Sequence, residues 1–357
     1  MKPQTGPLLL GFCCLLASWC LAQTPSAAFH DGGSSSCAVC HVMHASNDGQ
    51  VVIVDSAPLL LAATSSDLCL TCHDQESVFG YDPLIPPPEK GSGNFVFLLE
   101  DNINDAPDGQ INSLAGEGSG HSVVSLDRGT TSDSRWPEAP GGTFPSHELS
   151  CTSCHDPHGN SGFRMLNGVG PVQNGIAEFI YPAPAAIGID ITDPLAVESN
   201  DRHTAYISGM SEWCANCHGL YHDESSTASF AHPGDETLSS AQITIYNRYN
   251  GTGDPFGGTQ ATAYLKDVPF EQAGMTVSST AGPSAGSRIM CLSCHRAHAS
   301  SAPAATRWDM RIGLLDDDGL VSGSFPIPNP YPGSLQGALC RKCHPKGQRY
   351  DFDFSAP

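Results

Sequence analysis

Six copies of one five-residue pattern constrain this 357-residue chain more than any other feature. In each copy two cysteines are separated by two residues and are followed at once by a histidine, Cys-x-x-Cys-His. Apart from Cys13, Cys14 and Cys20 near the N-terminus, every one of the 15 cysteines belongs to such a copy, so none remains for a structural disulfide. The copies are Cys37–His41, Cys69–His73, Cys151–His155, Cys214–His218, Cys291–His295 and Cys340–His344.

Cys-x-x-Cys-His is typical of the covalent attachment site of c-type haem. Two thiols on one turn reach the two vinyl groups of a porphyrin as thioethers, and the adjacent histidine binds the iron. Thioredoxin-like sites and zinc ribbons share Cys-x-x-Cys but do not require the histidine. The sequence therefore predicts six haem c groups, attached in pairs at Cys37 and Cys40, Cys69 and Cys72, Cys151 and Cys154, Cys214 and Cys217, Cys291 and Cys294, and Cys340 and Cys343. The predicted proximal iron ligands are His41, His73, His155, His218, His295 and His344.

The composition is consistent with a chain wrapped around cofactors. Only 39% of residues are hydrophobic, and 37 glycines and 28 prolines disfavour the interiors of helices and strands. Porphyrins can supply the apolar interior that the side chains lack, and covalent attachment staples the chain as disulfides staple small secreted domains. We expect mostly irregular coil with short helices and few strands, wrapped around a continuous haem stack.

The histidines outside the motifs reveal a threefold internal repeat. The first, third and fifth motifs continue into His-x-x-His, which adds His44, His158 and His298, and a solitary histidine precedes each pair of motifs at His30, His121 and His232. The repeat units are about 30–73, 121–218 and 232–344, within a single hexahaem domain at 23–357.

These six histidines supply one predicted distal iron ligand for each haem: His30, His44, His121, His158, His232 and His298. Residues three apart lie on the same side of a turn, so His44 cannot cross to the far face of the haem held by His41 and should bind a different haem. The same holds for His158 and His298. Methionine is the alternative ligand, but no methionine recurs with the motifs. His147, His203 and His222 follow no threefold pattern and are interpreted as surface or supporting histidines.

The N-terminus resembles an export signal. Met1-Lys2 precedes an apolar run from Pro7 to Ala22, and small residues favour cleavage after Ala22, so residues 1–22 are interpreted as a signal peptide. The alternatives are a membrane anchor, for which the run is short, and a lipid attached at Cys20. The formal net charge of −21 argues against nucleic acid and anionic membranes as partners.

The residues around the motifs carry a more specific resemblance. The chain is similar to the filament-forming hexahaem cytochromes at the outer surface of metal-reducing bacteria, the outer-membrane cytochrome S type. The matching segments include residues 29–33, 37–44, 120–121, 140–145, 151–159, 209–218, 232–233, 291–300 and 339–344.

The resemblance implies six haems with two histidine ligands each in one stack, head-to-tail polymerisation, and secretion to the outer cell surface. It also implies that His44 binds a haem of the adjacent subunit, the one carried by Cys291 and Cys294. Such a filament would take electrons from periplasmic or outer-membrane cytochromes and pass them to metal oxides or partner cells. The alternatives are a monomeric periplasmic electron shuttle and, from another class, a multihaem reductase of nitrite or hydroxylamine, which would need an open iron site.

Overall fold

The computed structural model describes residues 37–42, 46–47, 50–51, 60–73, 91–102, 116–189, 198–222, 234–250, 257–310, 312–315, 330–331, 337 and 339–344. All six attachment motifs fall within these ranges. The predicted signal peptide and the predicted distal ligands His30, His44 and His232 lie outside them.

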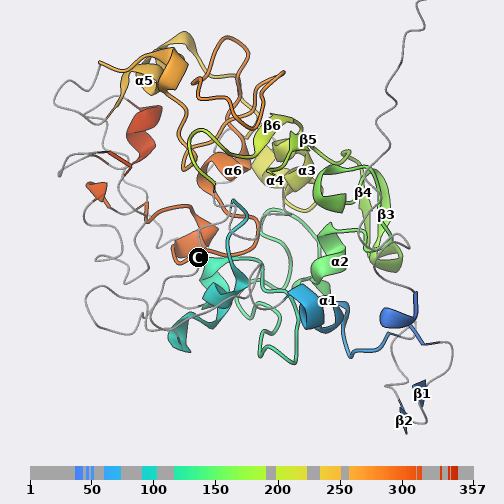
Figure 1. The fold of residues 1–357 in the computed structure, drawn as a ribbon. Helices are drawn as coiled ribbons and strands as arrows, with labels where there is room; N and C mark the ends of the chain where they lie inside the picture. Colours follow the sequence, from blue (N-terminus) through green and yellow to red (C-terminus); the bar gives the residue numbers. More distant parts are fainter. Residues whose placement is uncertain are drawn as a thin grey trace, which may run out of the picture.

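Regular structure in the described part of the chain is short and scattered, as predicted (Figure 1). The longest α-helices, α1 and α5, have nine residues each. The α-helices are α1 (Ser65–His73), α2 (Cys151–Cys154), α3 (Met210–Ala215), α4 (Gly219–His222), α5 (Ser240–Arg248) and α6 (Cys291–Cys294). The 3-10 helices are η1 (Cys37–Val39), η3 (Phe95–Asn102), η4 (Gly116–Ser119), η5 (Ser146–Glu148), η6 (Phe163–Met165), η7 (Gln173–Gly175), η8 (Gln260–Thr262), η9 (Pro303–Ala305) and η11 (Leu339–Lys342).

The strands form three separate antiparallel pairs: β1 (Ser46–Asn47) with β2 (Gln50–Val51), β3 (Gly170–Val172) with β4 (Ala177–Phe179), and β5 (Ala185–Ile187) with β6 (Ala205–Ser208). Gly170 is paired with Phe179, and Ala186 with Tyr206. None of the pairs extends into a larger sheet, so in the described residues most backbone hydrogen bonds are local turns and isolated bridges.

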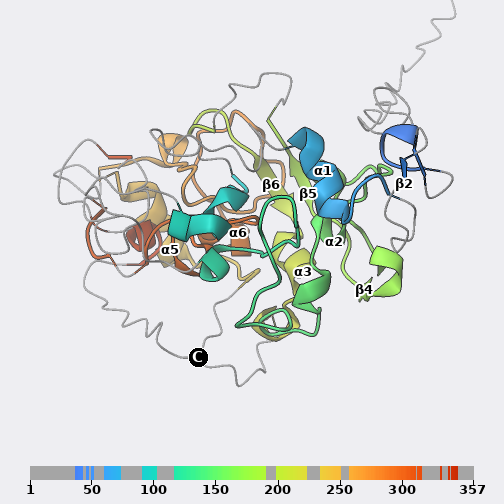
Figure 2. The same ribbon diagram turned by 90° about the horizontal axis from the view of Figure 1, so that it is seen from below.

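The short helices that carry the attachment motifs pack against one another. Helix α1 lies against α2, and α3 lies against both α4 and α6 (Figures 1 and 2). Helix α5 packs against η11, the 3-10 helix that carries the first cysteine of the sixth motif. Motifs that are distant in sequence therefore meet as neighbours.

Buried side chains form separate small clusters between these helices. The largest surrounds α5, where Tyr246 is 1% exposed and its hydroxyl donates to the carbonyl of Val268 at 2.7 Å. A second cluster joins Leu70 of α1 to Phe95 and Ala299. No helix in the described ranges has the length and apolar character needed to cross a membrane.

Candidate functional site

The attachment motifs share one local geometry, a single helical turn. The second motif forms the last turn of α1, and in the other five the amide of the motif histidine donates to the carbonyl of its first cysteine, four residues earlier. Two thiols and one imidazole then project from the same turn, the arrangement that a covalently bound haem requires. The donor–acceptor distances are 2.8 Å for His41, 3.0 Å for His155, 3.0 Å for His218, 3.0 Å for His295 and 2.9 Å for His344.

Two serines join neighbouring motifs in the same way. The hydroxyl of Ser66, three residues before Cys69, accepts from the amide of Cys151 at 3.3 Å. The hydroxyl of Ser211, three residues before Cys214, accepts from the amide of Cys291 at 3.2 Å. The second motif therefore meets the third as the fourth meets the fifth, which gives the repeat a counterpart in three dimensions.

The thiols of successive motifs approach one another along the whole chain. Those of Cys69 and Cys151 share a hydrogen bond, and so do those of Cys214 and Cys291. The other neighbouring motifs lie close enough for their thiols to interact electrostatically, at Cys40 and Cys69, Cys154 and Cys217, and Cys294 and Cys340. The closest approaches therefore join the second motif to the third and the fourth motif to the fifth.

The third and fifth motifs are followed by a matching left-handed turn. Nδ1 of His155 lies 2.9 Å from the carbonyl of Arg164, and Nδ1 of His295 lies 2.9 Å from the carbonyl of Ala304, in each case nine residues later. Two consecutive non-glycine residues adopt positive φ at each turn, which turns the carbonyl back toward the imidazole. The φ values are 52° and 56° at Arg164 and Met165, and 57° and 53° at Ala304 and Ala305.

Two more histidine rings are oriented by backbone carbonyls. Nδ1 of His218 lies 2.8 Å from the carbonyl of Pro140, and Nδ1 of His121 lies 2.6 Å from that of Ala297. An imidazole that donates from Nδ1 presents an unprotonated Nε2, which is the form that binds a metal. These carbonyls therefore fix the ring orientation that iron ligation needs.

The surrounding protein also keeps these imidazoles neutral. Desolvation, with the nearby His121, lowers the pKa of His218 to about 4. Desolvation, with the nearby His155 and His121, lowers the pKa of His298 to about 3. Neutral imidazole is the ligating species, so both rings are ready to bind iron throughout the physiological pH range.

Three pairs of imidazole rings lie about as far apart as two imidazoles bound to one iron would lie. Two iron–nitrogen bonds of about 2 Å plus the two ring radii place opposed ring centroids roughly 6 Å apart. Each pair joins a predicted proximal histidine to a predicted distal one. The centroid distances are 6.2 Å for His41 and His158, 6.4 Å for His155 and His298, and 5.9 Å for His218 and His121.

In two of these pairs the distal histidine belongs to a His-x-x-His turn. His158 lies nearest the ring of His41, and His298 lies near that of His155, so each is beside a histidine of another motif. Asp156 Oδ1 lies 3.6 Å from Nδ1 of His158, where a carboxylate can orient the ring. The two turns therefore bring the third motif beside the first and the fifth beside the third.

The His-x-x-His turn of the fifth motif is held between two extended segments. The amide of His121 donates to the carbonyl of His298 at 2.8 Å, and the amide of Asn94 donates to that of Ala299 at 2.9 Å. Gly120 is required at this crossing, because a Cβ there would meet the backbone of His298 and Ala299. The crossing sets His121 and His298 side by side although each faces a different motif.

The three histidines without a repeat pattern differ from one another. His147 is exposed at the surface. His203 is 1% exposed, stacks on Tyr264 with ring centroids 3.6 Å apart, and directs both ring nitrogens to backbone carbonyls, so it is a packing residue of the core. His222 is half-buried on α4, and its Nε2 has no hydrogen-bond partner.

The donor set fits c-type haem, because each turn carries paired cysteines and an imidazole, three of those imidazoles are oriented by backbone carbonyls, and three lie about 6 Å from a second imidazole. Sequence reasoning missed the orienting carbonyls and the two bridging serines. A glycine-rich loop such as 140–145 is a usable signal, since Gly142 lies against the carbonyl of Cys217 and leaves no room for a Cβ.

Comparisons with known proteins show which family the chain is similar to. A family model described as the doubled CXXCH motif matches residues 28–78. The chain is 32% identical to the C-type cytochrome OmcS of Geobacter sulfurreducens over 425 aligned positions, which cover 91% of this chain and 96% of that protein. The fold is also similar to two solved structures from the same organism, a cryo-EM structure of OmcS nanowires and a structure of the outer membrane cytochrome S filament. The TM-score is 0.70 for each. They are 26% and 28% identical and cover 89% of this chain and all of theirs. The chain therefore belongs to the OmcS family of multihaem c-type cytochromes.

Proposed function

We propose that this protein carries six c-type haems, each with two histidine ligands, and conducts electrons along them within a head-to-tail extracellular filament. The observation that carries the proposal is the set of three opposed imidazole pairs, each at about the separation of two axial ligands. The filament and extracellular parts rest also on the similarity to OmcS nanowires.

The three pairs obey a simple positional rule. The histidine that opens the second repeat unit, His121, faces the second motif of its own unit at His218. The His-x-x-His histidines, His158 and His298, face the first motif of the preceding unit, at His41 and His155. We extend both parts of the rule to the predicted ligands outside the described residues.

The first part assigns His30 to the haem of His73 and His232 to the haem of His344. The second part assigns His44 to the first motif of the unit before the first. Residues 1–29 hold no such motif, so the rule leads to the third unit of a neighbouring subunit and to its haem at His295. The contact is heterologous and repeats from subunit to subunit, so it generates a filament and no closed dimer.

The haem iron supplies one-electron redox chemistry when it is bound. The chain's own residues then attach the cofactors, hold both imidazoles neutral and oriented, and keep successive motifs close. Two histidines per iron leave no open coordination position for a substrate, which favours electron transfer over the catalysis of a reductase. The acidic surface favours cationic or mineral partners among extracellular acceptors, supplied by periplasmic or outer-membrane cytochromes upstream.

The test is the substitution His44→Ala, with His147→Ala as the control at an exposed histidine. We expect both variants to carry six haems by mass spectrometry. The control should form filaments under electron microscopy, and His44→Ala should remain monomeric with one haem per chain that binds an external ligand. Normal filaments from His44→Ala would refute the intersubunit ligand, and fewer than six haems in the unmodified protein would refute the cofactor count.

A further inference from the structure

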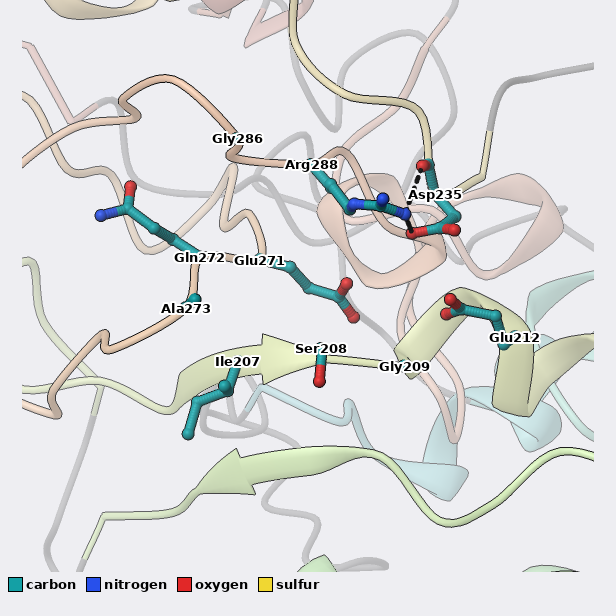
Figure 3. Close-up of a pocket in the computed structure, with 10 residues that line it drawn as sticks. All are labelled: Ile207, Ser208, Gly209, Glu212, Asp235, Glu271, Gln272, Ala273, Gly286 and Arg288. Carbon is teal, nitrogen blue, oxygen red and sulfur yellow. Dashed lines mark hydrogen bonds and ion pairs between the residues drawn. The ribbon is translucent and has the colours of Figure 1, made fainter.

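A cavity of about 340 Å³ lies beside the fourth and fifth attachment motifs, between the start of α3 and the segments around residues 235, 271 and 288 (Figure 3). Its wall includes three carboxylates, Glu212, Asp235 and Glu271, and one cation, Arg288. Arg288 Nη1 lies 2.5 Å from Asp235 Oδ1, so the single positive charge is already paired with one carboxylate. When all three carboxylates ionise, the wall carries excess negative charge.

Several polar atoms of this wall are buried without a hydrogen-bond partner. Glu271 is 1% exposed, and its Oε1 accepts from the amide of Met210 at 2.7 Å while its Oε2 has no partner. Oε2 of Glu212 is also buried without a partner. In Figure 3 the carboxylate of Glu271 points toward the side of the cavity where Glu212 and Asp235 lie. Buried acceptors left unpaired are costly, so a ligand that satisfies them is expected.

His222 is not among the residues that line the cavity, but it brings a nitrogen ligand close to two of its carboxylates, Glu212 and Asp235. One ligating atom each from Glu212, His222 and Asp235 lie within 4.8 Å of one another, and Nε2 of His222 is another buried atom without a partner. His222 is half-buried at the end of α4, four residues after the proximal His218. Two carboxylates and an imidazole that converge in this way form a typical metal-ligand set.

Protonation behaviour agrees with uncompensated negative charge. Burial, with the neighbouring Glu212 and Asp235, raises the pKa of Glu271 to about 7. Burial, with the neighbouring Asp235, also raises the pKa of Glu212. Each carboxyl group therefore holds a proton more strongly than it would in water.

We propose that Glu212, His222 and Asp235 bind one divalent transition cation, with Zn²⁺ as the reference, and that the buried Glu271 provides a further acceptor at the site. An imidazole nitrogen together with carboxylate oxygens suits Zn²⁺, whereas Ca²⁺ and Mg²⁺ prefer oxygen ligands alone. The ion would be structural, distinct from the haem irons.

Its position gives the ion a defined task. Glu212 lies on α3, the helix that carries Cys214, and His222 lies on α4 directly after His218. Asp235 follows the segment 223–233, which includes His232. One cation would therefore tie the two helices of the fourth motif to the chain entering the third repeat unit.

The experiment uses the complete haem-loaded protein, stripped of loosely bound metal with EDTA, incubated with ZnCl₂ and desalted. Zinc and iron are counted together by mass spectrometry of the elements. We expect about one tightly bound zinc per chain and a Zn²⁺ dissociation constant at least about tenfold weaker in Glu212→Gln and in His222→Gln. Iron content should be unchanged in both variants, and zinc should raise the melting temperature of the unmodified protein only. X-ray absorption at the zinc edge should show an imidazole among the ligands.

The control is His147→Gln, which changes an exposed histidine and should bind zinc like the unmodified protein. Zinc that persists unchanged in Glu212→Gln and His222→Gln, or no tight zinc in the unmodified protein, would overturn the proposal. A variant that loses iron has failed to assemble, and the isosteric Asp235→Asn then provides the decisive comparison. Haem content and filament assembly are measured separately, so a failed zinc site leaves the electron-transfer proposal standing.

Discussion

The imidazole of His158 lies opposite that of His41, with ring centroids 6.2 Å apart and planes 10° from parallel, although the two residues belong to different repeat units. On the proposed ligation, the residue that continues the third motif would be the second ligand of the haem at the first. The buried side chains of the described residues form separate clusters, so shared haem ligands of this kind would add links between neighbouring units.

This relationship predicts the effect of His158→Ala. We expect the variant to keep all its haems, because the thioether cysteines are intact, and to expose one five-coordinate iron per chain at the first motif. Carbon monoxide titration of the reduced protein should bind about one equivalent, against none in the His147→Ala control. Unchanged low-spin spectra in His158→Ala would show that His41 has another partner.

The left-handed turn after the fifth motif predicts a stabilising substitution. Ala304 is exposed and has φ 57°, a conformation that costs alanine roughly 1 kcal/mol and glycine almost nothing. Ala304→Gly should raise the free energy of unfolding by up to about 1 kcal/mol, and Ala304→Val should lower it by more. Denaturant unfolding followed by the haem absorbance tests both, and the carbonyl that orients His295 is retained in each variant. Equal stability of the three proteins would contradict the strain.

The contacts of Lys342, which lies between the two cysteines of the sixth motif, predict a destabilising substitution. Its buried ammonium donates to the carbonyls of Tyr246 at 2.9 Å, Tyr249 at 3.0 Å and Ala263 at 3.2 Å. Two of these carbonyls belong to the C-terminal end of α5, where cations are favoured. Lys342→Met would leave all three carbonyls without this hydrogen-bond donor. It should lower the free energy of unfolding, measured in denaturant, by about 2–4 kcal/mol. The neighbouring, less buried Arg341→Met should cost less than half as much.

Asp67 at the start of α1 predicts how stability depends on pH. Burial alone would raise the pKa of Asp67, but hydrogen bonds from Ser125, Thr64 and the amide of Asp127 outweigh it and lower the pKa below its ordinary value. The folded state therefore favours the ionised form. Its contribution is present above the ordinary aspartate pKa of about 3.9 and is lost as the pH falls through the lower folded-state value.

Asp67→Asn should accordingly be less stable than the unmodified protein at pH 6, and the difference should shrink as the pH falls below about 4. The matched control is Asp127→Asn, at an exposed side chain whose backbone amide still reaches Asp67. Melting temperatures across this pH range test the prediction. A constant difference at every pH would exclude Asp67 as the titrating group.

The sequence is sufficient for the attachment chemistry, because Cys-x-x-Cys-His defines a single turn whatever surrounds it. It also predicts the coil-rich fold, because the frequent glycines and prolines keep helices and strands short. The restriction on His158 and His298 follows from local geometry alone, but their partners do not, because the pairing with His41 and His155 depends on how repeat units pack.

Other features have no local signature. The carbonyls of Pro140 and Ala304 act through the backbone, so their residue types say little about their role. The sequence around His203 gives no sign that this histidine is buried, and its stacking on Tyr264 identifies it as part of the core. The convergence of Glu212, His222 and Asp235 joins separate segments, and no spacing rule connects them.

The His-x-x-His turns carry a mechanical consequence. If the two imidazoles of such a turn bind different haems, as we propose, a few covalent bonds of backbone link the two redox centres, which then cannot separate unless that turn itself unfolds. Warming or mild denaturant would first loosen the surrounding loops, which separate the haem positions from solvent. The conducting path should consequently fail later than the coat around it, and current through the assembly should outlast the spectroscopic signs of an ordered fold.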